Sequence, residues 1–211
     1  MELADALAGR RSCRSYLRDP IDALVLRRVL GAARRGPTAG NSWGLELLVL
    51  EGRAETDRYW DASLPTGPRR DAFAWPGLLL APVLVIPTVR PSAYVERYAE
   101  PDKARTGLGA GADAWPVPYW WVDAGAAVMG ILLAATAEGL GSLLFGTFGA
   151  SGASGASGTV GAVTAELGIP AEAELVGCIA LGHPDRSGER RSGSLRRPRP
   201  PLDEIVHRGT W

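Results

Sequence analysis

The chain has 211 residues and a mass of 22.2 kDa, a length typical of one globular domain that buries about 70% of its unfolded surface. Its 23 Lys and Arg residues balance 23 Asp and Glu residues, so the formal net charge is zero. This balance argues against a nucleic-acid-binding protein, which needs a basic excess to neutralise phosphates. With 46% hydrophobic and 22% charged residues, the composition also argues against wholesale disorder.

The first half of the chain contains alternating helix and strand patterns. We predict a short helix at residues 2–9, a helix that opens at Asp19-Pro20 and ends at Gly36-Pro37, strands at 45–50 and 78–89, and a helix at 53–60. Residues 90–118 show no clear periodicity. Because so long an irregular stretch in a compact domain is usually functional or mobile, we interpret it as a candidate mobile lid.

The second half is expected to continue the alternation. Asp123 stands where it could cap a helix that ends at Glu138-Gly139, and this apolar run of about 16 residues is shorter than the ~20 that a bilayer span needs. We predict strands at residues 143–148 and 175–181, a helix at 159–167, and a flexible Ser/Gly/Ala loop at 150–158. Strands separated by helices indicate a layered α/β or α+β domain spanning residues 1–211.

Cysteine content and the N-terminus bear on the compartment. Two cysteines, Cys13 and Cys178, cannot build a disulfide framework or a four-ligand zinc site by themselves, and we expect no metal. The N-terminus lacks a basic region followed by an apolar core, so no secretory signal is evident and a cytoplasmic protein is expected.

Two segments have residue types that suit a ligand. Residues 10–14 carry three arginines and a serine between two predicted helices, a pattern that favours a phosphate site, with a solvated basic turn as the alternative. A second basic cluster, at residues 196–199, could reach the same phosphate. The loop 37–44 offers small residues and Asn41, which suit the edge of a polar heterocycle, or it is an ordinary Gly-rich loop. The residues alone thus indicate a phosphate-bearing ligand and leave open whether it is planar.

Glycines near residue 140 invite comparison with a dinucleotide fingerprint. A Rossmann glycine loop follows a strand and precedes a helix, whereas Gly139-Leu140-Gly141-Ser142 follows a predicted helix. We therefore interpret these glycines as a helix stop.

Several segments, taken in chain order, match the motifs of one protein family. Residues 10–16 (RRSCRSY) resemble R-R-S-x-R-x-[FY], residues 30–41 resemble L-x-A-A-x-x-A-P-S-x-x-N, and residues 123–142 resemble a central helix and its exit. Residues 167–170 and 181–184 match L-G-I-P and L-G-[YH]-P, and residues 197–207 resemble R-x-P-x-x-x-[IV]-V-H. The ordered set spans almost the whole chain and resembles the FMN-dependent nitroreductase family.

The resemblance implies a fold and a site. The fold would be α+β, a three-layer α/β/α sandwich with a mostly antiparallel central sheet flanked by helices, in an intertwined homodimer with FMN in two interfacial pockets. The FMN phosphate and ribityl end would be held by Arg10, Arg11, Ser12 and Arg14, together with Arg196 or Arg197. The partner chain would border the isoalloxazine with Pro37, Thr38, Ala39 and Asn41, and the ring would lie beside Leu144, Phe145, Gly146 and Thr147.

The chain departs from the family pattern in two places. The family often follows its Asn with x-Q-P-W, whereas this chain has Ser42-Trp43-Gly44-Leu45. Where many relatives continue tightly after the strand beside the flavin, this chain has the Ser/Gly/Ala repeat. The first departure bears on the shape of the pocket.

The resemblance also implies an activity. We expect an FMN-dependent oxidoreductase that passes hydride from NAD(P)H to an electron-poor acceptor such as a nitroaromatic, a quinone or an enone. Because flavin carries this chemistry, no side chain is required as a nucleophile. Two alternatives remain open: a flavin enzyme of the same fold with another reaction (dehydrogenation, reductive dehalogenation or flavin fragmentation), and a non-catalytic flavin-binding protein.

Overall fold

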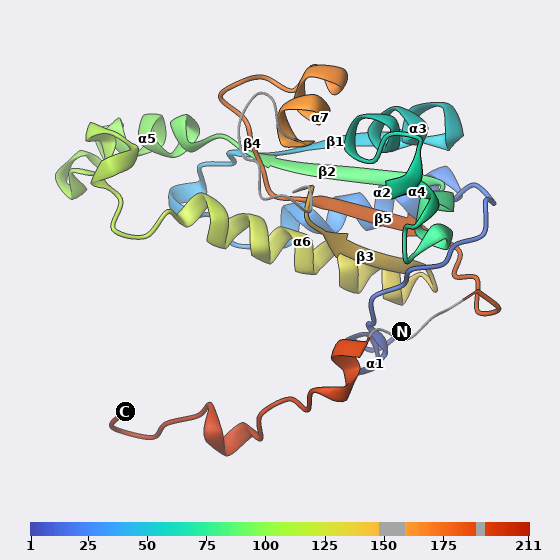
Figure 1. The fold of residues 1–211 in the computed structure, drawn as a ribbon. Coiled ribbons are helices and arrows are strands. Elements are labelled where there is room, and N and C mark those ends of the chain that lie inside the picture. The colour runs from blue at the N-terminus through green and yellow to red at the C-terminus, as the bar shows by residue number, and fades with distance from the viewer. Residues whose placement is uncertain (148–158, 189–192) are drawn as a thin grey trace.

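A central sheet lies between two layers of helices in the computed structural model of this chain, which describes residues 1–147, 159–188 and 193–211 (Figure 1). The Ser/Gly/Ala segment 150–158 lies outside the described residues. The helices are α1 (Leu3–Gly9), α2 (Ala23–Gly31), α3 (Gly52–Ser63), α4 (Pro68–Asp71), α5 (Pro91–Ala99), α6 (Tyr119–Ala137) and α7 (Thr159–Leu167). The α+β class, with its antiparallel sheet, is confirmed.

The sheet has five strands: four follow the order β1-β2-β5-β3, and the short β4 pairs with β2. All these pairings are antiparallel. The strands are β1 (Leu45–Glu51), β2 (Val83–Val89), β3 (Gly141–Phe145), β4 (Glu174–Leu175) and β5 (Cys178–Gly182). β2 and β5 are buried along their whole length, and apart from Thr88 both consist of small and apolar residues. β1 and β3 therefore form the two edges of the sheet.

Alternate residues of β2 enter the two cores on the two faces of the sheet. Val83 and Val85 pack with α2 and α6, whereas Leu84 and Ile86 pack with α3 and α7. This alternation follows from the two-residue period of a strand. The two faces give the three layers of the sandwich, with α6 running beneath the sheet in Figure 1.

The 19-residue helix α6 is long and apolar enough to cross a membrane, but it packs against the sheet. Its inward face, which includes Ala124, Ile131 and Ala135, is completely buried. The prediction that Asp123 caps this helix is wrong, because the helix begins at Tyr119 and Asp123 lies inside it, only 5% exposed.

Other element boundaries also differ from the prediction. α2 begins at Ala23 because Asp22, rather than Asp19, accepts hydrogen bonds from the backbone N–H groups of Leu24 and Val25. The predicted strand 78–89 begins only at Val83, after a 3-10 helix at Pro76–Leu80. The predicted strand 175–181 is divided between β4 and β5 at Gly177, whose φ is 152°.

Residues 90–118 are not the irregular stretch that the sequence predicts. They form α5 and three 3-10 helices, at Ala104–Thr106, Leu108–Ala110 and Ala112–Ala114. Tyr94, Trp115 and Trp120 form a small aromatic core for this segment, with ring centroids 5.8–5.9 Å apart. The segment therefore has packing of its own, and its motion as a lid stays a prediction.

Candidate functional site

The arginine-rich segment 10–14 lies along the free edge of β3. Ser12 forms a parallel bridge with Ser142, and the Cys13 N–H donates to the Ser142 carbonyl at 2.9 Å. Cys13 is buried and packs so closely on β3 that a Cβ at Gly141 would meet its Sγ at 2.7 Å. Because the cysteine anchors the segment inward, the neighbouring residues Ser12 and Arg14 are left partly exposed.

Two aromatic residues fix the end of this segment. The buried Tyr16 hydroxyl donates to the Cys13 carbonyl at 3.0 Å, and burial is the main cause that raises its pKa well above the usual value. The Arg14 guanidinium lies over the Trp75 ring, 5.0 Å from its centroid, which restrains a side chain that would otherwise be mobile. The segment thus presents preorganised cations at a sheet edge.

A cavity of about 360 Å³ opens at the other end of β3, between that strand, α3 and the segment around α4. The Trp60 and Phe145 rings stack with centroids 5.6 Å apart and an interplanar angle of 6°. The buried Tyr59 hydroxyl lies 3.4 Å from Thr147 Oγ1. Phe145, Gly146 and Thr147, singled out from the sequence, line this cavity, whereas Leu144 is 41% exposed and does not.

Sequence reasoning missed most of the residues that line this cavity, among them Tyr59, Trp60 and Arg69. Arg69 provides a cation in a wall that is otherwise mostly aromatic and apolar. The buried Trp60 Nε1 has no hydrogen-bond partner among the described residues, which is costly unless a ligand or water accepts from it. The sequence feature that could have indicated this cavity is the aromatic pair Tyr59-Trp60 at the end of a predicted helix.

The basic segment and the aromatic cavity are joined by β3. Ser142, beside Ser12, and Phe145, in the cavity wall, are three residues apart, about 10 Å along a strand. A ligand with a phosphate linked by a chain to a planar ring fits this spacing, and FMN has that form. The Trp60 N–H, unpartnered among the described residues, is a donor for a polar atom of such a ligand, and the stacked rings give the cavity an aromatic wall.

The loop containing Pro37, Thr38, Ala39 and Asn41 is held at a different place, by α5 and α6. Asp123 accepts hydrogen bonds from the Ala39 N–H at 2.7 Å and from the Tyr94 hydroxyl at 2.8 Å. Burial first, and then Asp123, raises the pKa of Tyr94. The Arg97 guanidinium donates to the Gly40 carbonyl at 2.8 Å and also pairs with Asp102.

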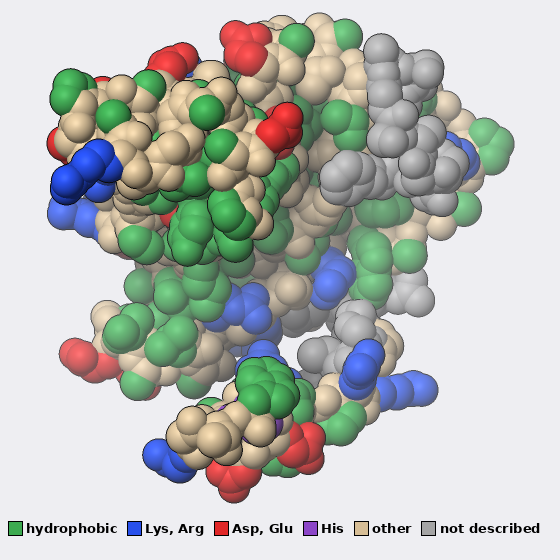
Figure 2. Space-filling view, turned by 90° about the vertical axis from the view of Figure 1, so that its left-hand side faces the viewer, with side chains coloured by type: hydrophobic (Ala, Val, Ile, Leu, Met, Phe, Trp, Pro, Cys, Tyr) green, Lys and Arg blue, Asp and Glu red, His purple; other side chains and the backbone are tan. Residues whose placement is uncertain are grey.

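One chain does not bring all the predicted site residues together. Gly9, next to the arginine segment, packs on Thr136 of α6, whereas Ala39 bonds to Asp123 of the same helix. These contact points are thirteen residues apart, or about 20 Å along a helix. Arg196 and Arg197 are exposed at the start of a C-terminal arm, residues 196–211, whose residues are all exposed. Figure 2 shows Lys and Arg side chains in the hollow between this arm and the body.

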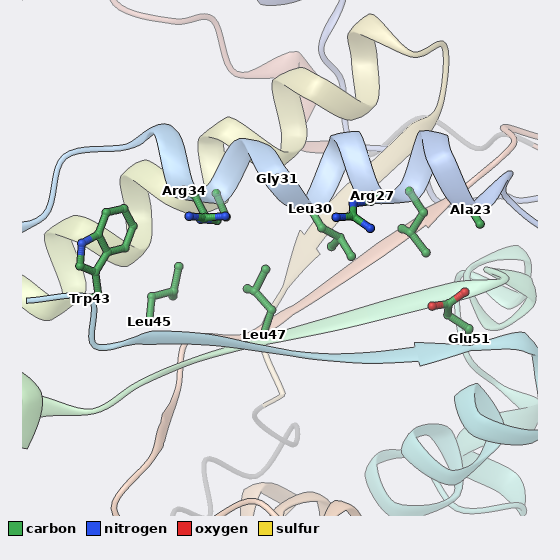
Figure 3. Close-up of a pocket in the computed structure, with 11 residues that line it drawn as sticks. Ala23, Arg27, Leu30, Gly31, Arg34, Trp43, Leu45, Leu47 and Glu51 are labelled. Atoms are coloured by element: carbon green, nitrogen blue, oxygen red, sulfur yellow. The ribbon is translucent and has the colours of Figure 1, made fainter.

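A second cavity, of about 470 Å³, forms a groove between α2 and the edge strand β1 (Figure 3). Its floor is made of leucines: Leu26, Leu30, Leu45 and Leu47. Arg27 and Arg34 project from the helix side, Trp43 stands at one end and Glu51 lies at the other. Within the described part of the chain, neither arginine has an ion-pair partner.

Comparison with known proteins decides the family. The model of the nitroreductase family matches residues 7–183. The chain belongs to the nitroreductase family. Its relatives include a NADH dehydrogenase of Thermus thermophilus, 26% identical over 202 residues that cover 89% of each chain.

Solved structures of this family share the fold. A nitroreductase family protein from Clostridium difficile superposes with a TM-score of 0.65 at 19% identity, covering 100% of both chains. NADPH:FMN oxidoreductase from Vibrio harveyi, solved with NAD⁺, superposes with a TM-score of 0.67 at 17% identity, covering 99% of this chain and 77% of that one. The recognition of a nitroreductase fold from sequence motifs is therefore confirmed.

Proposed function

We propose that this nitroreductase family member is an FMN-dependent oxidoreductase that passes hydride from NAD(P)H to an electron-poor acceptor such as a nitroaromatic, quinone or enone. The observation that carries the proposal is the placement of a basic segment and an aromatic cavity at the two ends of β3. The family match and the names of the Thermus and Vibrio relatives support NAD(P)H and flavin use.

The residues of this chain would bind and orient FMN, and bound FMN supplies the hydride chemistry. Arg10, Arg11, Ser12 and Arg14 would hold the phosphate and ribityl end through charge-assisted hydrogen bonds, with Arg196 or Arg197 closing from the arm. Phe145, Gly146 and Thr147 would border the ring, with Leu144 just outside. Arg69 would place a positive charge near the ring, where it stabilises the electron-rich reduced state electrostatically.

We further propose that the protein is cytoplasmic. We also propose that it is a homodimer, because one chain does not bring all the predicted site residues together. The outward face of α6 exposes apolar side chains, including Trp121 (38%), Val122 (52%) and Met129 (38%). A helix that is apolar on all sides is normally covered on all sides. If two chains pack through α6, each chain would place its Pro37, Thr38, Ala39 and Asn41 beside the aromatic cavity of the other chain.

The C-terminal arm of one chain and the groove between α2 and β1 of the other chain have complementary apolar and charged residues. The arm exposes Leu202 (68%) and Ile205 (60%) beside Asp203 and Glu204. The groove offers a leucine floor flanked by Arg27 and Arg34, which have no ion-pair partner among the described residues. Deleting residues 200–211 should therefore yield a monomer with weakened FMN binding, measured by light scattering and flavin fluorescence. A truncated protein that stays dimeric would contradict binding of the arm in this groove.

Anaerobic titration of the flavin tests the proposed activity. The purified protein should be yellow, with near-equimolar FMN that NADH or NADPH bleaches and that a quinone or nitroaromatic reoxidises. Bleaching by an organic substrate and by neither nicotinamide would favour another flavin reaction. Bound FMN without any turnover would favour a flavin-binding protein. Protein that is colourless and takes up no added FMN would overturn the proposal.

A further inference from the structure

The loop between the 3-10 helix Ala39–Asn41 and β1 holds an unusual backbone conformation. Asn41 has a φ of 60° and Trp43 a φ of 52°, both in the left-handed region. Asparagine visits this region more readily than most residues, but a bulky tryptophan there is a genuine outlier. Within the described residues these are the non-glycine positions with positive φ, and such strain concentrates at ligand sites.

The strained backbone brings two side chains together. The Trp43 indole N–H donates to Oδ1 of Asn41. An indole nitrogen is only a donor, so the atom that it contacts must be the amide oxygen rather than the amide nitrogen. This contact therefore settles the orientation of the Asn41 carboxamide, whose two N–H donors must face away from Trp43.

Neighbouring elements hold the backbone but not this side chain. Asp123 accepts from the Ala39 N–H and Arg97 donates to the Gly40 carbonyl, so α6 and α5 hold the Thr38–Ala39 and Gly40–Asn41 peptide groups. Neither of them contacts the Asn41 carboxamide in any hydrogen bond of the described residues. Since Asn41 is exposed, its amide would rotate freely without Trp43.

We propose that Trp43 is a positioning residue that turns the Asn41 carboxamide so that its N–H donors, and not its oxygen, face the ring of the bound flavin. The inference rests on the proposed function, in which Asn41 borders the isoalloxazine of the partner chain. It assigns a role to the residue that stands where the sequence departs from x-Q-P-W.

The polarity of the flavin ring makes this orientation consequential. The pyrimidine edge of the ring carries two carbonyl oxygens and the nitrogen N1, which accept hydrogen bonds and become more electron-rich on reduction. A donor that faces them stabilises the reduced ring more than the oxidised ring. An amide oxygen in the same place would repel them, so the orientation of Asn41 should shift the reduction potential as well as the affinity.

Two substitutions test the inference in the FMN-loaded dimer. Trp43→Phe keeps an aromatic wall at the end of the groove but removes the indole donor. We expect it to weaken FMN binding by about three- to tenfold and to lower the flavin midpoint potential. Asn41→Asp should lower the FMN affinity and the midpoint potential further, because it places a carboxylate oxygen next to the ring. In the Asn41→Asp background, Trp43→Phe should add no further change in potential, since no amide remains to be oriented.

Trp115→Phe is the matched control, because it also removes an indole hydrogen bond, from Nε1 to the Leu108 carbonyl at 3.0 Å, but away from Asn41. It should lower the melting temperature without moving the potential. Wild-type affinity and potential in Trp43→Phe would overturn the inference and leave the proposed function intact. Wild-type protein that binds no FMN would overturn the proposed function and the inference with it.

Discussion

Arg14 differs from most arginines of this chain in how firmly it is placed. It follows a buried cysteine that is bonded to β3, and its guanidinium rests on Trp75. By contrast, Arg53 makes an ion pair with Asp57 on the solvent-facing side of α3, a contact that contributes little to stability. Composition could not separate these cases, because almost every cation in the chain is arginine.

The first prediction concerns this segment. Replacing Arg10 and Arg14 together by Ala should weaken FMN binding by about 2–4 kcal/mol, because two charge-assisted contacts to the phosphate are lost. Equilibrium titration of apoprotein with FMN measures the change. Arg105→Ala, at a distant exposed 3-10 helix, is the control and should bind like wild type. Equal affinity in the double variant would mean that residues 10–14 form only a solvated basic turn.

Single residues also show where sequence reasoning stops. Asp123 stands at the start of a long apolar run, so capping was a reasonable interpretation of the pattern. The helix instead extends back to Tyr119, and the buried carboxylate serves two groups that are 84 and 29 positions away in sequence. A local pattern contains no information about such distant partners.

Among the elements, those with strong periodicity were predicted best. The helices α3 and α7 and the strand β1 lie close to the predicted ranges because their apolar spacing repeats, whereas α2 is shorter at both ends than predicted. The segment 90–118 was missed because α5 and the 3-10 helices are short and packed around a local aromatic core. The packing that stabilises these pieces is tertiary and leaves no period in the sequence.

The second prediction concerns the contact between α5, α6 and the loop at Ala39. Asp123→Ala should lower the free energy of unfolding by roughly 2–4 kcal/mol, because the Tyr94 hydroxyl and the Ala39 N–H both lose their acceptor in a buried place. Chemical denaturation measures the loss. Asp113→Ala, at an exposed position of the same region, should change stability by less than about 0.5 kcal/mol. A similar loss in both variants would contradict a specific role for Asp123.

At the scale of the whole molecule, buried tyrosines set the alkaline limit of stability. Burial is the main cause that raises the pKa of Tyr16, Tyr59 and Tyr94 above the ordinary tyrosine value, and it raises the pKa of Cys178 as well. These groups keep their protons in the folded state but lose them in the unfolded chain. Because the unfolded state then binds fewer protons, stability must fall as pH rises.

The third prediction follows from that sign. The free energy of unfolding, measured by urea titration, should be level up to about pH 8, begin to fall as the Cys178 thiol of the unfolded chain ionises, and fall more steeply above about pH 10, where unfolded tyrosines ionise. The chain has one lysine, Lys103, so few other groups titrate in this range. Tyr16→Phe should make the decline shallower. A free energy that stays level to pH 11.5 would contradict the burial of these hydroxyl groups.

The two edges of the sheet carry a consequence for the behaviour of the isolated chain in solution. The edge of β3 is occupied by its own arginine segment, whereas β1, with the sequence LELLVLE, pairs only with β2 among the described residues. A seven-residue open edge rich in leucine is a template on which further strands of other molecules can add. With the binding site proposed for the arm, a variant that lacks residues 200–211 should be monomeric when dilute and should aggregate at high concentration, although its fold is intact. Covering β1 in a dimer would therefore keep this chain soluble as well as hold the two chains together.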